Sequence, residues 1–511
     1  MENIQLNNPD SQHKSQGQDT SKASVPAKLN PKFDELTEPK VFVNHVEELT
    51  QLKATPHAEI LSELLEQFEP VNFEADANPN SKDNFKLSQK HFLVLAIENV
   101  IHVAEKHQWG LCKHHDFIYL FNGTHWAELD NETFQKFLGH AAEKMGVPTF
   151  SARYFRFRKQ LYEQFLATAY LDPKPPLAEK VLINLKNGTF EVSTENTFLR
   201  PFDRSDFLTY QLPFEYNPEA KAPLFDTYIN RVLPDKASQL VLAEYLGYVF
   251  IKHGSNRLKE EKALILYGTG ANGKSVFFEI VSALLGNENT SNYSLQSLTD
   301  NSGYYRAKLA NKLVNYGSEI NGKLESSLFK QLVSGEPVEA RLPYGNPLVL
   351  RQYAKLIFNC NELPKDVEHT NAYFRRFLII PFDVTIPAEE QDKQLHTKII
   401  ERELSGVFNW VLEGLNRLLG QTKFTDCDVA KQTLEQYKSQ SDSVKMFMEE
   451  NDYNRSPSNY ILIKELYSEY QIFCSEDGFK PVNKTNFKKR LKGYQVLIER
   501  RNVGHVAYLS K

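Results

Sequence analysis

The stretch ALILYGTGANGKSVFFEIVSALLG, residues 263–286, decides how the centre of this chain folds. Its first five residues form a short apolar run typical of a buried strand, and Val276 to Leu285 has the apolar pattern of a helix. Between them lies G-x-x-x-x-G-K-S, whose glycines let backbone N–H groups point at phosphate oxygens beside the positive end of the helix. The stretch predicts a nucleotide-binding loop made of Gly268, Thr269, Gly270, Ala271, Asn272, Gly273, Lys274 and Ser275.

Two side chains of this loop have chemical roles in the prediction. Lys274 is expected to reach the β- and γ-phosphates, and the hydroxyl of Ser275 is expected to ligate Mg²⁺. The alternative interpretation is a glycine turn between a strand and a helix, with Lys274 solvated.

Hydrolysis also needs a carboxylate, which normally follows a neighbouring strand. The segment KLVNYGSEI (312–320) places Glu319 at the end of a short apolar run. Two acids usually stand together at such a position, whereas here Ser318 precedes Glu319. Glu319 is therefore expected to serve both Mg²⁺ and the attacking water, and the alternative is a surface glutamate after a strand.

Two later segments add polar groups beside apolar strands. In KLIFNCNELP (355–364), Asn361 follows a buried strand and is a candidate for bonding the γ-phosphate or the lytic water; by itself it also fits a turn. In FRRFLIIPF (374–382), Arg375 and Arg376 precede a strongly apolar strand. Paired arginines there often only cap surface charge, but in a site built between subunits one of them stabilises transition-state charge.

Length and composition exclude several classes of protein. The chain has 511 residues, of which 41% are hydrophobic, and a net charge of −5. These values exclude a wholly disordered or fibrous chain and a uniformly basic coat protein. The four cysteines are far apart, which favours reduced thiols in a cytosolic protein over disulfides or a zinc ribbon. We expect neither a transmembrane helix nor a secretory signal.

The pattern along the chain predicts about three folded domains and a tail. Short strands alternating with helices over 261–383 predict an α/β unit with a largely parallel sheet. The expected divisions are a disordered tail (1–38), short helices and a linker (39–86), a mixed α+β domain (87–250), an ATPase domain (251–425) and a C-terminal DNA-binding domain (433–511). Hairpins are expected at 117–129 and 181–192, around Asn-Gly pairs.

Positive charge is concentrated in two segments. Residues 480–511 hold nine basic residues and one acid. VNKTNFKKRLKGY (482–494) reads as a helix and VLIERRNVGHVAYLS (496–510) as two strands, which together look like a winged helix. Its candidate DNA contacts are Lys484, Lys488, Lys489 and Lys492. The segment RYFRFRKQLY (153–162) interleaves basic and aromatic residues; single-stranded DNA contact and a helix with a basic outer face are equally compatible with it.

The ordered set of Gly268–Ser275, Glu319, KQLVSGEPVEARLPYGNP (330–347), Asn361 and FRRFLIIPF resembles the superfamily-3 helicases. More narrowly, it is similar to the phage/plasmid primase-associated helicases related to the poxvirus primase–helicase, over roughly residues 100–505. The resemblance implies an AAA+-like ATPase that uses ATP and Mg²⁺, a ring that is commonly a hexamer, and a nucleotide site at the subunit boundary. It also implies that Asn361 is a sensor and that Arg375 or Arg376 is an arginine finger supplied by a neighbouring subunit.

In such rings a β-hairpin grips DNA in the pore, and SGEPVEARLPYGNPLVLRQ (334–352) has suitable chemistry. Arg341 and Arg351 can meet phosphates, and Tyr344 can stack on a base. The alternative is an exposed hairpin without DNA contact.

The sequence thus predicts an ATP-dependent DNA helicase that moves on single-stranded or forked DNA during replication of a phage, plasmid or mobile element, and the resemblance implies movement from 3′ to 5′. It is expected in the bacterial or infected-host cytoplasm, with primase activity on a separate chain. Two alternatives stay open. The first is an ATP-switched initiator or loader, and the second is a DNA-packaging or defence NTPase that responds to duplex DNA or to a protein partner.

Overall fold

A computed structural model describes residues 57–78, 85–107, 109–114, 117–169, 180–193, 197–255, 258–318, 320, 325–342, 347–364 and 367–511. The expected disordered tail (1–38), the first part of the segment 39–86, Glu319 and Tyr344 lie outside these residues. Within the described residues, no helix combines the length and the apolar character needed to cross a membrane.

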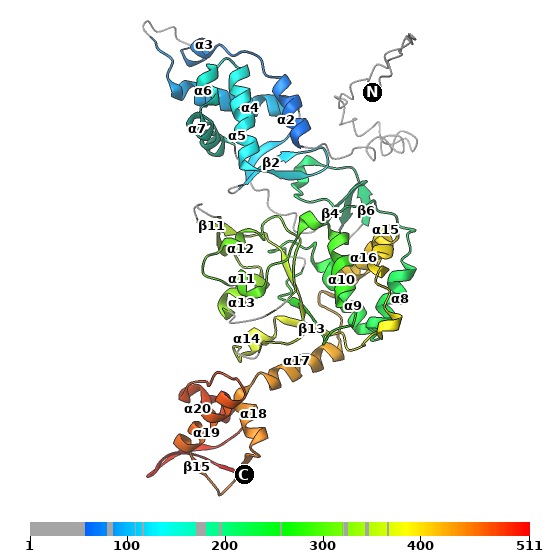
Figure 1. The fold of residues 1–511 in the computed structure, drawn as a ribbon, viewed down its shortest axis with the longest axis vertical. Coiled ribbons are helices and arrows are strands. Elements are labelled where there is room, and N and C mark those ends of the chain that lie inside the picture. Colours follow the sequence, from blue (N-terminus) through cyan, green and yellow to red (C-terminus); the bar gives the residue numbers. More distant parts are fainter. Residues whose placement is uncertain are drawn as a thin grey trace, which may run out of the picture. The chain divides into compact units, whose positions relative to one another are not determined.

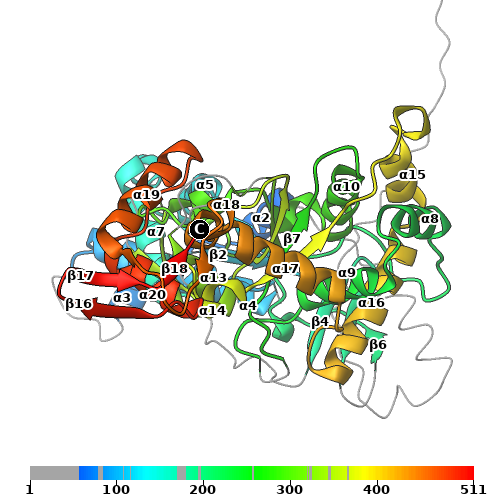
Figure 2. The same cartoon turned by 90° about the horizontal axis from the view of Figure 1, so that it is seen from below.

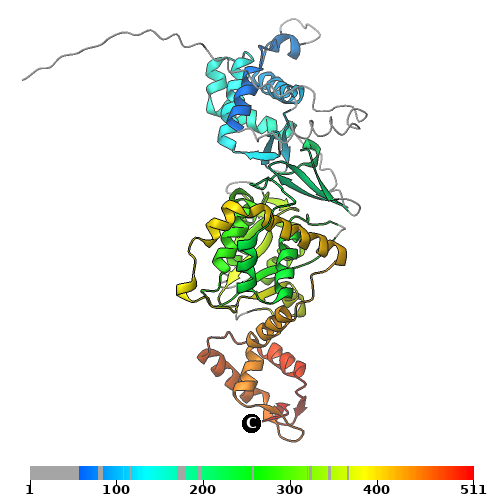
Figure 3. The same cartoon turned by 90° about the vertical axis from the view of Figure 1, so that its right-hand side faces the viewer.

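The first described part combines six helices with a small antiparallel sheet of order β1-β2-β3. The blue and cyan helices can be followed in Figure 3. Its core contains Phe134, Phe137, Leu161 and Phe165, which recur on one face of their helices. The elements are α2 (His57–Glu66), α3 (Phe73–Ala77), α4 (Gln89–Lys106), β1 (Leu111–His114), β2 (Phe117–Phe121), β3 (Trp126–Leu129), α5 (Asn131–Lys144), α6 (Thr149–Arg153) and α7 (Phe155–Thr168).

The two expected hairpins are present, with turns that differ from the prediction. β2 and β3 pair antiparallel, but a loop of four residues joins them, in which the Asn122 side chain accepts hydrogen bonds from the N–H groups of Thr124 and His125. In the second hairpin Gly188 pairs with Leu185 and so belongs to the strand. The residues expected to form a linker at 74–86 include most of α3.

A second sheet, of order β4-β5-β6, precedes a helical pair. Its elements are β4 (Val181–Leu185), β5 (Gly188–Val192) and β6 (Thr197–Arg200), followed by the 3₁₀ turn η2 (Arg204–Asp206), α8 (Pro223–Val232) and α9 (Lys236–Tyr248). Asp235 begins α9, because its carboxylate accepts from the N–H of Ser238 at 2.8 Å.

The centre of the fold is a five-stranded sheet of order β13-β7-β12-β9-β8, with every pairing parallel. Its strands are β7 (Ala263–Tyr267), β8 (Thr290–Ser291), β9 (Val314–Gly317), β12 (Lys355–Cys360) and β13 (Phe377–Pro381). β7 and β13 are apolar along their whole length, and β9 is buried at every position, as expected for strands covered on both faces. This sheet confirms the α/β prediction for residues 261–383.

The two faces of the sheet support different cores. Leu264 and Leu266 of β7 face a cluster with α9, α10 and α16, whereas Ala263 and Ile265 face a second cluster with α11 to α14. Alternation along one strand therefore produces helix–sheet–helix layers. The helices and turns are α10 (Lys274–Leu285), η3 (Asn287–Asn289), α11 (Leu295–Leu298), α12 (Tyr304–Ala307), α13 (Ser326–Ser334), α14 (Asn371–Phe374), η4 (Ala388–Glu390), α15 (Leu395–Arg402), α16 (Leu404–Gln421) and α17 (Asp428–Gln440).

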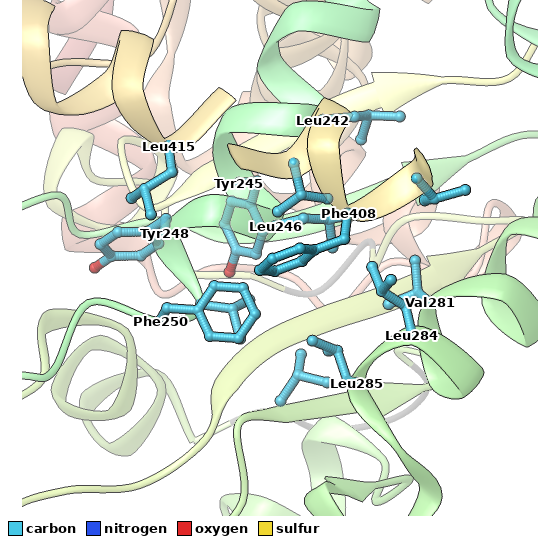
Figure 4. Packing of buried hydrophobic residues seen from close by; sticks show 14 of the residues in the cluster. Leu242, Tyr245, Leu246, Tyr248, Phe250, Val281, Leu284, Leu285, Phe408 and Leu415 are labelled. Carbon is cyan, nitrogen blue, oxygen red and sulfur yellow. The ribbon is translucent and has the colours of Figure 1, made fainter. Parts of the chain in front are cut away.

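Helices α9 and α16 lie side by side, as Figure 2 also shows. Their backbones approach so closely at Gly414 that a Cβ there would lie 2.3 Å from the carbonyl carbon of Ala243. Figure 4 shows Leu242, Tyr245, Phe408 and other side chains of this core. Residues 181–251 thus share one core with the central sheet.

The C-terminal part has its own core, formed by helices α18 (Ser443–Glu450), α19 (Ile463–Glu476) and α20 (Lys484–Gly493) and by short strands. β15, β17 and β16 make an antiparallel sheet in that order, and β14 pairs with β18. The strands are β14 (Asn454–Arg455), β15 (Ile461–Leu462), β16 (Ile498–Arg501), β17 (Gly504–Ala507) and β18 (Leu509–Ser510). The whole can be traced in Figure 1 in orange and red.

Candidate functional site

The glycine-rich loop joins the end of β7 to the start of α10. Gly270 and Gly273 have φ values of +116° and +87°, which only glycine adopts without strain. The first intrahelical bond runs from the N–H of Phe277 to the carbonyl of Gly273, at 3.1 Å. The N–H groups of the first turn have no carbonyl partner within the helix. They therefore lie as available donors at the positive end of α10, beside the loop.

Lys274 lies inside this loop, although it begins a helix. Only 5% of its surface is exposed, and its ammonium donates to the carbonyl of Gly268 at 2.6 Å and to Oδ1 of Asn272 at 3.1 Å. Burial lowers the pKa of Lys274. The amide of Asn272 donates to the carbonyl of Phe382 at 2.9 Å, which ties the loop to the residue after β13. A buried cation is thus held by neutral oxygen atoms, an environment that an anion would improve.

Helix α8 fixes the last glycine of the loop. The hydroxyl of Tyr228 donates to the carbonyl of Gly273 at 2.8 Å, and a Cβ on Gly273 would lie 2.7 Å from Cγ1 of Val232. Sequence reasoning did not identify this contact between Tyr228 and the loop. No local signal marks it, because the two residues are 45 positions apart.

The register of the sheet brings three strand ends together. Cys360 pairs with Tyr267, so Asn361 and Gly268 each follow directly, and the N–H of Gly268 donates to the carbonyl of Cys360 at 3.0 Å. Phe358 pairs with Gly317, so Ser318 leaves β9 at the same carboxyl edge. Asn361 is exposed there, and Ser275 is exposed on the first turn of α10. Glu319, the next residue after Ser318, lies outside the described residues.

Arg375 and Arg376 lie at the opposite, amino edge of the sheet. The N–H of Ala263, the first residue of β7, donates to the carbonyl of Arg376 at 2.8 Å. The five residues of β7 separate this position from Gly268, a strand length of about 16 Å. The structure therefore does not bring either arginine to the glycine-rich loop of the same chain.

The two arginines have different surroundings. Arg376 is buried, its guanidinium donates to Oγ of Ser334 at 2.8 and 3.2 Å, and it lies 3.4 Å from the carboxylate of Glu261. The side chain of Arg375 is 56% exposed and lies 3.0 Å from the same carboxylate. Arg376 is thus built into the fold, while Arg375 projects from it.

The expected β-hairpin is formed by β10 (Val338–Arg341) and β11 (Pro347–Leu350), which pair antiparallel. Arg341 and Arg351 are exposed, and the turn that contains Tyr344 lies outside the described residues. Val338 and Ala340 are buried, whereas Val349, which pairs with Glu339, is half exposed on the other face.

The base of this hairpin is bonded to residues that precede β7. The N–H of His253 donates to Oε1 of Gln352 at 3.0 Å, and the side-chain amide of Gln352 donates to the carbonyl of His253 at 2.7 Å. Nζ of Lys355, the first residue of β12, lies 3.1 Å from Nδ1 of His253. The hairpin is therefore attached to the sheet at the start of β12, the strand that Asn361 follows.

The C-terminal basic segment forms α20 as its pattern predicts. Phe487 and Leu491 are fully buried in the C-terminal core. Lys484, Lys489 and Lys492 are exposed and Lys488 is partly exposed, while the neighbouring Arg490 is 3.0 Å from Asp442. The helix thus presents its lysines to solvent, and β16 and β17 follow as a pair of antiparallel strands.

Three family models match separate parts of the chain. "D5 N terminal like" matches residues 99–234, a family of unknown function (DUF5906) matches 266–376, and "Poxvirus D5 protein-like" matches 439–499. The second of these ranges contains the glycine-rich loop, the hairpin and both arginines.

Two curated viral proteins are similar to this chain. "Putative helicase L207/L206" of Acanthamoeba polyphaga mimivirus is 24% identical over 218 residues, and "Putative helicase 121R" of Invertebrate iridescent virus 3 is 25% identical over 309 residues. These matches cover 39% and 53% of this chain. The chain spans only 22% and 32% of the length of these relatives.

Solved structures of the C-terminal region of NrS-1, in apo form, also align with the chain. One covers 81% of this chain and 98% of its own, with 12% identity and a TM-score of 0.44. Another covers 82% and 100%, with 14% identity and a TM-score of 0.42. The two D5-type family models and the two viral relatives support a similarity of this chain to the D5-like primase–helicase family.

Proposed function

We propose that this protein is an ATP-dependent DNA helicase of the superfamily-3 type, which translocates on single-stranded DNA during replication of a viral, plasmid or other mobile genome. The observation that carries the proposal is the environment of Lys274, a buried ammonium surrounded by neutral oxygens in a loop at the positive end of a helix. Such a loop between a parallel strand and a helix suits the binding of a polyphosphate. The viral relatives named as helicases support the choice of activity.

The residues around the loop fit ATP and Mg²⁺. A Cβ on Gly268 would lie 2.3 Å from the amide of Asn272, so the loop closes tightly around its own backbone. In the proposal Lys274 binds the β- and γ-phosphates, Ser275 and Glu319 hold Mg²⁺, and Asn361 orients the γ-phosphate or the attacking water. Bound Mg²⁺ supplies neutralisation of the charge that develops on the phosphate oxygens.

The arginine finger is proposed to be Arg375 and to act on a neighbouring subunit. Both arginines lie near Glu261, but Arg375 is exposed, whereas Arg376 is buried and its guanidinium is already bonded to Ser334. The distance of about one strand length between Arg375 and the loop exceeds the reach of an arginine side chain of the same chain. A ring of AAA+-like domains, commonly a hexamer, supplies such a neighbour.

DNA is proposed to meet two surfaces. Arg341, Arg351 and Tyr344 of the hairpin contact the strand in the pore, where cations bind phosphates without regard to sequence. The C-terminal part acts as a winged helix, with Lys484, Lys488, Lys489 and Lys492 toward DNA. A primase or another replication protein is the proposed partner of the assembly.

The first experiment replaces Lys274. Lys274→Ala removes the phosphate contact and is expected to abolish ATP hydrolysis, while Lys259→Ala, an exposed lysine before β7, keeps wild-type activity. Both proteins are assayed for ATPase with and without single-stranded DNA, and for unwinding of a forked duplex. Full hydrolysis by Lys274→Ala contradicts the assigned site. Hydrolysis without unwinding favours the initiator switch, and stimulation by duplex DNA alone favours a packaging or defence NTPase.

A mixing experiment tests the finger. Lys274→Ala and Arg375→Ala are each expected to be inactive alone, but an equal mixture rebuilds a complete site at about one quarter of the subunit boundaries of a ring. Recovery of hydrolysis toward that level supports action between subunits. A mixture that stays inactive while both variants still assemble contradicts it.

A further inference from the structure

The elbow between α6 and α7 exposes three aromatic rings that the fold does not use. Phe150 is 92% exposed, Phe155 is 66% exposed, and Tyr154, which ends α6 and begins α7, is also exposed. The rings of Tyr154 and Phe155 lie 5.1 Å apart, nearly perpendicular. Burying one phenylalanine typically stabilises a protein substantially, so three such rings in six residues indicate a surface that binds something. The labels α6 and α7 locate it in Figure 1.

The packing of α7 explains why these rings face outward. Phe157, Leu161 and Phe165 are buried and recur every four residues, so they form the inward stripe of the helix. Phe155 precedes that stripe by two residues, which places it on the far side of the helix. Its exposure is therefore dictated by a rigid helix, and it persists without rearrangement of the core.

Positive charge surrounds the rings. Residues 144–162 contain five basic residues and no acid, in a chain whose net charge is −5. The guanidinium of Arg156 lies 5.7 Å from the ring centre of Phe155, and no carboxylate of the described residues pairs with it. The side chain of Lys159 is 68% exposed, and its ammonium lies as far as 3.9 Å from the carboxylate of Glu163, so this ion pair is weak. Arg153 and Arg158 are instead bonded to Glu143 and to the carbonyl of Ala152.

We propose that this elbow binds single-stranded nucleic acid, with bases stacked on Phe150, Tyr154 and Phe155 and phosphates bound by Arg156 and Lys159. Aromatic rings interleaved with cations are what such a strand requires, because every base has a stacking face and every link carries a charge. The site is separate from the hairpin and from α20, and it does not depend on ATP hydrolysis by the loop.

The composition of the patch favours a nucleic acid over a protein. Apart from Pro148, its exposed apolar side chains are aromatic, since Met145, Val147 and Leu161 in the same segment are buried. A docking surface for protein would combine rings with exposed aliphatic side chains and with charges of both signs. The two acids beside the segment, Glu143 and Glu163, stand at its ends, and the excess of positive charge between them matches a polyanion.

The test uses the full-length chain and fluorescent oligothymidine or oligouridine of about twenty nucleotides, followed by anisotropy. Phe150→Ala/Phe155→Ala is expected to weaken binding at least ~10-fold, because stacking on each ring strengthens binding several-fold. Phe198→Ala, an exposed ring on β6, is the matched control. The two oligonucleotides distinguish DNA from RNA, and ATPase activity without nucleic acid should stay unchanged in every variant.

A second variant separates charge from stacking. Arg156→Gln/Lys159→Gln should lower the slope of log affinity against log salt by about 1.4, the value for two phosphate contacts on a single strand. Equal affinity of the ring variant and the wild type overturns the proposal. Two other results overturn it as well. In the first, the ring variant changes only self-association, which would identify a contact between copies of the chain; in the second, it weakens only the binding of a protein. If Lys274→Ala fails to abolish hydrolysis, the proposed nucleotide site is wrong, but the proposal for the elbow between α6 and α7 is unaffected.

Discussion

Lys355 offers a quantitative test of how the hairpin is attached to the sheet. It is 6% exposed at the start of β12, with its ammonium 3.1 Å from Nδ1 of His253 and 4.2 Å from the ring centre of Tyr248. Burial alone lowers the pKa of Lys355 to about 7, from an ordinary 10.5. At 1.36 kcal/mol per unit of pKa, the cost of keeping this lysine charged in the folded protein is about 4–5 kcal/mol.

The sign of the pH effect follows from proton binding. Between about pH 7 and 10.5 the unfolded chain keeps the proton of Lys355 while the folded chain has lost it. The unfolded state therefore binds more protons, and the contribution of this residue to stability rises with pH across that window. Below pH 7 both states are protonated, and the full cost is present. The pKa of His253 is lowered well below its ordinary value, so its ring stays neutral in this window.

The perturbation is Lys355→Met, which keeps the length of the side chain and removes the amine. The variant is expected to be more stable than the wild type near pH 7.5, by several kcal/mol, and this advantage should shrink by about 1.4 kcal/mol per pH unit toward pH 9.5. Urea unfolding at four pH values measures both, and Lys480→Met at the surface provides the control. A difference between Lys355→Met and wild type that does not vary with pH would refute the reasoning.

Three other substitutions, with Arg375→Ala as a control for one of them, test packing in this part of the chain. Gly273→Ala introduces a Cβ 2.7 Å from its neighbour at φ +87°, so it should cost about 1–3 kcal/mol and weaken binding of a fluorescent ATP analogue. Arg376→Ala should lower the free energy of unfolding by about 2–3 kcal/mol, since it strands its bonded partners, whereas Arg375→Ala should change it by less than about 0.5 kcal/mol. Glu244→Ala removes the buried carboxylate that lies 2.6 Å from the guanidinium of Arg417. Loss of this ion pair should lower the free energy of unfolding, measured by thermal unfolding, by about 3–5 kcal/mol.

The central sheet was predictable because each strand is an apolar run bounded by polar or glycine residues. Local pattern also places Gly268 and Asn361 after strands, and parallel pairing then brings them to one edge. The order of the strands was not available from the sequence, because it depends on which runs pair across about a hundred residues. The separation of Arg375 from the loop follows from that order and from the direction of β13.

The contacts between helices that are far apart in the chain could not be predicted from the sequence either. The sequence suggested a division near residue 250, yet α9 and α16 pack through Gly247 and Gly414, each with its backbone against the other helix. Glycine lowers helix propensity, so its role at these two positions is apparent only once the helix packed against it is known. Tyr228 is a similar case: its spacing identifies a buried position, while its hydroxyl bond to Gly273 is a fact of tertiary structure.

The amino edge of the sheet connects the two functions assigned to this part of the chain. Arg375 projects from that edge, and its neighbour Arg376 is bonded to Ser334, the last residue of α13, a short step before the hairpin begins at Val338. The hairpin returns to the same edge at Lys355, which starts the strand that Asn361 follows. Contact of Arg375 with the phosphates of a neighbouring subunit would thus act on the segment that leads into the hairpin at Val338. Phosphates bound by the subunit's own loop would act, through β12, on the segment that leaves the hairpin. Because packed β-strands move as units, the proposed function predicts that hydrolysis at either subunit boundary shifts the hairpin relative to the single-stranded DNA proposed to contact it.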